Sequence, residues 1–164
     1  MSIIGIMLAV AGPQFGSFSD NSKIRTSSRD FQSFILLART EAVTRGSFIN
    51  LVSTEDDNWG GEILMCATNT GPTTACTAAT AIQIANFGND EVAIKSSNNG
   101  DPIISFNSRG RLSGATSATT VELAFCDQRG TEAGDKAKIL TINVTGRPNI
   151  EGLDVLQGHS CDPA

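Results

Sequence analysis

Residues 24–46 read IRTSSRDFQSFILLARTEAVTRG. Small and apolar side chains recur in this stretch at alternating spacings of three and four, which is one face of an α-helix. Gly46 follows Arg45 and is a typical left-handed helix stop. The stretch therefore predicts a long amphipathic helix that ends near Gly46. The recurring positions are Ile24, Ser28, Phe31, Ile35, Ala38 and Ala42, and Phe34, Leu37 and Val43 widen the face.

The chain opens with an almost uncharged apolar run, residues 1–11, which Gly12 and Pro13 interrupt. This run is too short for a bilayer span, which takes about 20 apolar residues. We expect it to be the end of a longer apolar helix, with a buried core helix or a signal remnant as alternatives. If the helix breaks at Pro13, Asp20 or Ser22 can cap the next one. Otherwise Pro13 lies in a helix that is continuous from residue 1.

Everything after Gly46 has the pattern of short strands and turns. We predict an α+β fold in which a long N-terminal helix packs on antiparallel sheets. The chain then divides into the helix, residues 1–46, and a β-rich head, residues 47–164. The expected strands are residues 48–53, 62–66, 81–85, 92–95, 103–106, 121–126 and 139–144.

The four cysteines, of which none forms a C-x-x-C pair, favour disulfides over a zinc site. Four cysteines allow three pairings. We expect Cys66–Cys76, which closes a small loop, and Cys126–Cys161, which ties down the C-terminal tail. The alternative is a cytosolic protein with four buried thiols, which the polar surroundings of Cys161 disfavour.

Catalytic and cofactor motifs are missing from the sequence. His159 is the only histidine, and it stands two residues from Cys161, which is not the usual arrangement of a base and a nucleophile. The chain has neither a G-x-S-x-G elbow nor a phosphate-binding glycine motif. We therefore expect no enzyme, no metal and no cofactor.

Basic residues gather in two turns. Arg109 and Arg111 flank Gly110, and Arg147 follows Gly146. If these turns meet at one end of a sheet, they form a small positive patch that could hold phosphates. The net charge of −5 argues against broad nucleic-acid binding, and we favour solvated turn charges. Other charges near these turns in sequence are Arg129, Lys136 and Lys138, with Asp127, Glu132 and Asp135 as possible ion-pair partners.

At this point the order of features resembles the GspH/FimT class of type IV minor pilins and type II secretion pseudopilins. The resemblance covers nearly the whole chain. It is carried by MSIIGIMLAVAGPQF at 1–15, FILLARTEAVTRG at 34–46, NWGG at 58–61, ISFNSRG at 104–110 and Thr145-Gly146-Arg147.

The resemblance implies a pilin fold and a structural FimU/GspH-like subunit of a pilus or secretion pseudopilus, located at its tip or in its priming complex. It also implies a prepilin whose cleavage site, and the Glu after it, lie upstream of Met1. The subunit would sit in the bacterial inner membrane through its full-length helix, face the periplasm, and join other pilins or a cell-surface pilus. We expect Ile24, Phe31 and Ile35 to lie on the helix face that contacts other subunits.

The alternative that the resemblance implies is DNA capture by a competence pilin of the FimT kind. Such pilins carry a Gly-Arg-x-Arg motif near the C-terminus. Here the segment is Gly146-Arg147-Pro148-Asn149, so the second arginine is missing. DNA contact through Arg109, Arg111 and Arg147 is thus a possible but not a favoured function.

Overall fold

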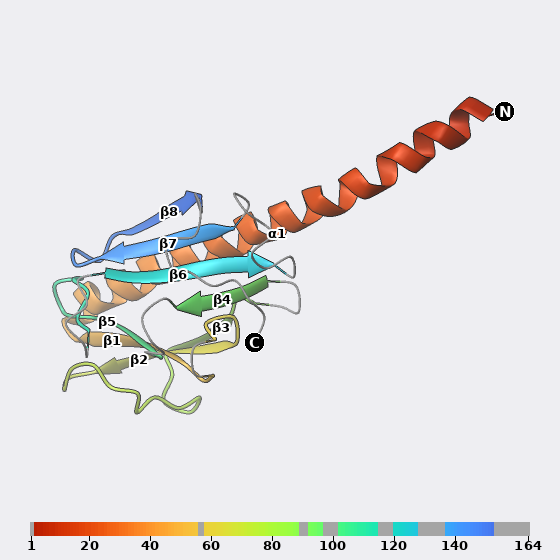
Figure 1. Ribbon diagram of the computed structural model, residues 1–164. Helices are drawn as coiled ribbons and strands as arrows, with labels where there is room; N and C mark the ends of the chain where they lie inside the picture. Colours follow the sequence, from red (N-terminus) through yellow and green to blue (C-terminus); the bar gives the residue numbers. More distant parts are fainter. Residues whose placement is uncertain are drawn as a thin grey trace.

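The computed structural model describes residues 2–55, 58–88, 92–96, 102–114, 120–127 and 137–152, with the backbone alone for residues 2–18. One long helix, α1 (Ser2–Arg45), precedes a head made of strands. The second half of α1 lies against the head, and the first half projects away from it (Figure 1). The predicted combination of one N-terminal helix with antiparallel sheets is confirmed.

Helix α1 is continuous through Pro13. Asp20 and Ser22 consequently lie inside the helix and do not cap its start. The helix ends at Arg45, and Gly46 follows it with φ of 64°, the left-handed conformation that stops a helix without steric cost in glycine.

The strands form two antiparallel four-stranded sheets, with orders β3-β2-β1-β5 and β4-β6-β7-β8. A bridge between Asn58 and Lys95 connects the first sheet's β1–β2 loop to β4. The strands are β1 (Phe48–Ser53), β2 (Glu62–Thr68), β3 (Gln83–Asn86), β4 (Val92–Ser96), β5 (Ile103–Phe106), β6 (Thr120–Asp127), β7 (Lys138–Asn143) and β8 (Pro148–Gly152).

The core lies between α1 and the two sheets. Phe31 is fully buried, and its ring packs edge-on against those of Trp59, Phe87 and Phe125, with centroids 6.2, 5.0 and 5.7 Å away. Edge-to-face contacts of this kind stabilise aromatic clusters beyond the area that they bury. Helix and sheets therefore share one hydrophobic core.

The structure corrects the role expected for Ile24, Phe31 and Ile35. All three side chains are fully buried in the chain's own core. They cannot contact another subunit, because strands of the same chain already cover them. The periodicity of residues 24–42 marks the intramolecular face of the helix.

The Cys66–Cys76 disulfide is confirmed, with the two Cα atoms 5.9 Å apart. It links the buried end of β2 to the Thr- and Ala-rich loop that leads to β3. Cys126, on β6, is also disulfide-bonded. Its predicted partner, Cys161, lies outside the described residues.

Candidate functional site

Two turns with the same sequence pattern and the same hydrogen bonds lie at one end of the head. In the first, residues 107–111 (NSRGR), the side-chain oxygen of Asn107 accepts hydrogen bonds from the backbone N–H groups of Arg109 (3.0 Å) and Arg111 (3.1 Å). The N–H of Gly110 donates to the carbonyl of Asn107 at 2.8 Å. Gly110 has φ of 68°, which favours glycine at this position.

The second turn, residues 143–147 (NVTGR), joins β7 to β8 and repeats this arrangement. The side-chain oxygen of Asn143 accepts from the N–H groups of Thr145 (3.0 Å) and Arg147 (3.2 Å). The N–H of Gly146 donates to the carbonyl of Asn143 at 2.8 Å, and its φ is 74°. The shared pattern N-x-x-G-R is visible in the sequence. The sequence analysis considered the glycines and arginines of the two turns but missed that each turn begins with an asparagine.

The two turns, which we call the paired turns, contact each other and the helix. The N–H of Leu112 donates to the carbonyl of Val144 at 3.2 Å. The Nε of Arg39, on α1, donates to the carbonyl of Gly110 at 2.9 Å. Arg39 thus anchors the paired turns to the helix, a role that the sequence analysis missed.

The paired turns bring the predicted basic residues together at one end of the head. Arg109, Arg111 and Arg147 are all exposed there. Lys138 begins β7, and a six-residue strand places it about 17 Å from the second turn. The patch therefore contains the three arginines without Lys138. Arg129, Lys136, Glu132 and Asp135 lie outside the described residues.

The outer side of α1 also carries apolar side chains. Leu36, Leu37 and Val43 are 43%, 38% and 54% exposed. At 100° per residue, Leu36 and Val43 point about 140° and 120° away from Phe31, which lies in the core. The second half of the helix is therefore apolar on two sides, and its own head covers only one of them.

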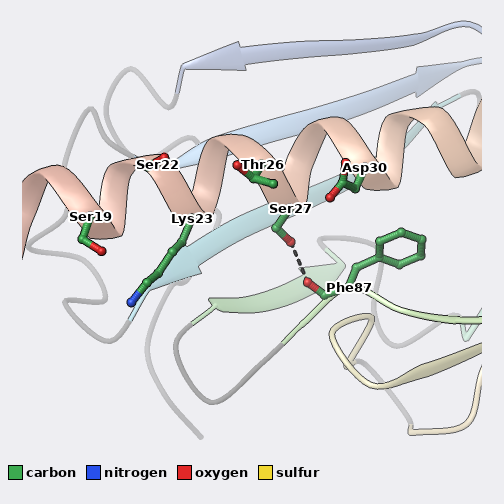
Figure 2. Close-up of a pocket in the computed structure, with 7 residues that line it drawn as sticks. All are labelled: Ser19, Ser22, Lys23, Thr26, Ser27, Asp30 and Phe87. Carbon is green, nitrogen blue, oxygen red and sulfur yellow. Dashed lines mark hydrogen bonds between the residues drawn. The ribbon is translucent and has the colours of Figure 1, made fainter.

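A small polar hollow of about 340 Å³ lies beside α1 where the helix leaves the head (Figure 2). Its wall includes Ser22, Lys23, Ser27, Asp30 and Phe87. The hydroxyl of Ser27 donates to the carbonyl of Phe87 at 2.7 Å, which joins the helix to the loop after β3. Lys23 and Asp30 supply one charge of each sign, so the hollow does not favour a charged ligand.

Catalytic or metal-binding groups are not assembled in the part of the chain that the structure describes. No group of three or more His, Cys, Asp and Glu side chains there could hold a metal ion. His159 and Cys161 lie outside the described residues. Within those residues, no helix combines the length and the apolar character needed to cross a membrane.

The profile of the family described as type II transport protein GspH matches residues 27–146, which is more than half of the chain. The chain belongs to the GspH family. The match includes the core face of α1 from Ser28 onward, both sheets up to β7, and both glycines of the paired turns. No curated protein matches the sequence significantly.

Solved structures agree with membership of the GspH family. The type IV minor pilin FimU of Pseudomonas aeruginosa, in its P21 crystals, has a TM-score of 0.67 and 21% identity, over 88% of this chain and 99% of FimU. In the P65 crystals the TM-score is 0.63 and the identity 20%, over 84% of this chain and 99% of FimU. The fold is thus that of a type IV pilin.

Family and fold together make this GspH-family protein a structural subunit of the minor pilin or pseudopilin type. Such subunits assemble with other pilins or pseudopilins, and the family implies a place in the bacterial envelope or in a pilus.

Proposed function

We propose that the protein acts at the tip or in the priming complex of a type IV pilus or of a type II secretion pseudopilus. The observation that carries this proposal is the two-sided apolar character of α1. Phe31 and Ile35 face the protein's own head, while Leu36 and Val43 face outward. Apolar side chains that the fold leaves uncovered on a helix are typical of a surface that another helix covers.

The likeness to a minor pilin supports a position at the start or the end of a filament. FimU, whose fold the chain shares, is a minor pilin. A minor subunit can influence the whole filament if one copy is needed to start assembly or to form the tip.

Before assembly, the N-terminal helix holds the subunit at the inner membrane, and the head faces the periplasm. In the filament, the exposed apolar side chains of α1, which are Leu36, Leu37 and Val43, pack against helices of neighbouring subunits. This surface takes the role that the sequence analysis gave to Ile24, Phe31 and Ile35.

The test is complementation of a strain that lacks the gene, with a gene that carries Leu36→Glu and Val43→Glu. Surface filaments are counted by electron microscopy and secreted protein is measured. We expect no restoration, because two carboxylates on an apolar helix contact are costly to bury. A priming role also predicts that the number of filaments falls while the length of each filament is unchanged.

Val144→Glu is the matched control, since Val144 is 41% exposed but lies on a turn. It should restore assembly fully. Both variants should keep the thermal unfolding midpoint of the wild type. The proposal is wrong if the deletion strain makes filaments and secretes normally, or if the helix double variant restores both.

A second candidate function is DNA capture, and one observation favours it. The contact between the paired turns gathers Arg109, Arg111 and Arg147 at one end of the head. Exposed arginines held close together can bind successive phosphates of a duplex. The net charge of −5 and the missing second arginine of the Gly-Arg-x-Arg motif weigh against this function.

A gel shift with duplex DNA at low salt tests this second candidate. DNA capture predicts a complex that weakens as salt rises and that Arg147→Ala weakens further. Lys23→Ala, at the other end of the head, is the control and should leave the complex unchanged. Absence of a complex at low salt rejects DNA capture.

A further inference from the structure

A groove of about 450 Å³ lies between α1 and the strands β7 and β8. Arg25 and Arg29 line it from the helix, and Lys138 lines it from the start of β7. Ser28, Gln32 and Asn149 supply further polar groups. None of the described residues that line the groove is acidic. The groove therefore concentrates positive charge on a protein whose net charge is −5.

Local geometry explains why these cations meet. Arg25 and Arg29 are four residues apart, so they lie on the same side of α1. Lys138 lies on the same face of β7 as the buried Leu140 and Ile142, because alternate residues of a strand share a face. It therefore faces the helix. Its partner in the ladder is Gly152, which has no side chain to fill the space.

The groove has walls that the fold fixes in place. The Nε2 of Gln32 donates to the carbonyl of Pro148 at 3.4 Å, which ties α1 to β8. The Nδ2 of Asn149 donates to a carboxylate oxygen of Glu151 at 2.6 Å, which places one acidic group beside the outer wall. The hollow beside Lys23 and Asp30, by contrast, is balanced in charge.

The position of the groove indicates its ligand. Residues 1–19 contain no charged side chain, and α1 carries them straight out of the head. Arg25 lies about 10 Å along the helix axis from Phe18. Helical side chains tilt toward the N-terminus, which directs the arginines toward this uncharged stem. A phospholipid headgroup layer is roughly 5–8 Å thick. When the stem enters a bilayer as far as Phe18, the backbone of Arg25 lies just outside the headgroup layer and that of Arg29 about 6 Å farther out. Their long side chains, directed toward the stem, reach back toward the lipid phosphates.

We propose that this groove binds the phosphate groups of anionic phospholipids and seats the head on the membrane surface before assembly. The inference rests on the proposed function in one respect: the stem must enter the bilayer for the groove to meet the headgroups. Guanidinium and ammonium groups are the side chains that bind phosphates, and Arg does so through paired hydrogen bonds.

The test compares binding of the 164-residue chain to vesicles of phosphatidylcholine, with and without phosphatidylglycerol. A variant with Arg25→Gln, Arg29→Gln and Lys138→Gln removes the cations of the groove. Each basic side chain near an anionic surface contributes about 1 kcal/mol, so the preference for phosphatidylglycerol should fall roughly 100-fold.

The matched control is Arg109→Gln, Arg111→Gln and Arg147→Gln, which removes the same charge from the far end of the head. Because these arginines lie farther from the groove than the Debye length of about 8 Å, the lipid preference should be unchanged. Equal losses in both variants would show unspecific attraction and overturn the proposal, as would no loss in the groove variant. Thermal unfolding confirms that both variants fold.

Two further arms separate other sources of phosphate. If free glycerol phosphate binds the groove as tightly as phosphatidylglycerol vesicles do, a soluble ligand is indicated and the lipid is excluded. If the groove variant loses binding to duplex DNA but keeps its lipid preference, the groove serves nucleic acid instead.

The vesicle result and the assembly result can fail separately. Should the helix variant with Leu36→Glu and Val43→Glu assemble normally, the proposed function fails, and the vesicle measurement is unaffected. Should only the vesicle measurement fail, the outer side of α1 still accounts for assembly.

Discussion

A Cβ atom added to Gly146 would lie 2.2 Å from the carbonyl oxygen of Gly110. The paired turns can therefore touch only because the second of them has no side chain at this position. Arg39 strengthens the contact, since it binds the same carbonyl oxygen from the helix. The end of the head that carries the arginines is thus built on one close approach of two backbones.

Gly146→Ala should destabilise the protein by about 3 kcal/mol, because it combines a backbone clash with an unfavourable positive φ. Urea denaturation measures this change. Gly46→Ala is the matched control: its φ is 64°, but nothing lies within 4 Å of the added Cβ. It should cost only the conformational part, about 1–2 kcal/mol. Equal effects of the two substitutions would contradict the close approach.

Asn143→Ala should cost about 1–2 kcal/mol, because the N–H groups of Thr145 and Arg147 lose their acceptor. Asn107→Ala should cost a similar amount, since the first turn has the same bonds. Asn149→Ala, which removes a hydrogen bond to the exposed Glu151, should stay within about 0.5 kcal/mol of the wild type. Thermal or urea unfolding distinguishes these outcomes, and a large effect at Asn149 alone would refute the role of the turns.

Phe31→Ala should destabilise the head by roughly 3–5 kcal/mol, because it leaves a cavity among three aromatic rings. Leu36→Ala, on the outer side of the same helix, should change stability by less than about 1 kcal/mol. Calorimetric unfolding compares the two. The assignment of inner and outer faces is wrong if Leu36→Ala costs as much as Phe31→Ala.

Replacing Cys66 and Cys76 together by alanine should lower the free energy of unfolding by about 2–3 kcal/mol, as expected for a short loop with a sequence separation of 10. The comparison is made without reductant, so that the disulfide of Cys126 stays intact. Cys76→Ala alone should lose nearly as much, because either change removes the bond. A loss confined to the double variant would contradict this explanation.

Local patterns in the sequence account for most of the secondary structure. The spacing of residues 24–42 predicts α1, and Gly46 predicts its end, because both depend on neighbours along the chain. Seven strands were predicted close to their observed positions for the same reason. Strand β8 was missed, because Pro148, Asn149 and Gly152 disfavour strands, and the pairing with β7 that holds them is not visible in the local sequence.

What the sequence determined by itself is which side chains alternate, which glycines turn the chain, and that one helix face is apolar. Only the tertiary structure decided what covers that face: Ile24, Phe31 and Ile35 are sealed by their own head, while Leu36 and Val43 are left outside. It also decided which cations meet, placing Lys138 with Arg25 and away from Arg147. Periodicity is set by covalent neighbours, whereas cover and charge clustering depend on segments far apart in the sequence, such as those of Arg29 and Lys138, that only folding brings together.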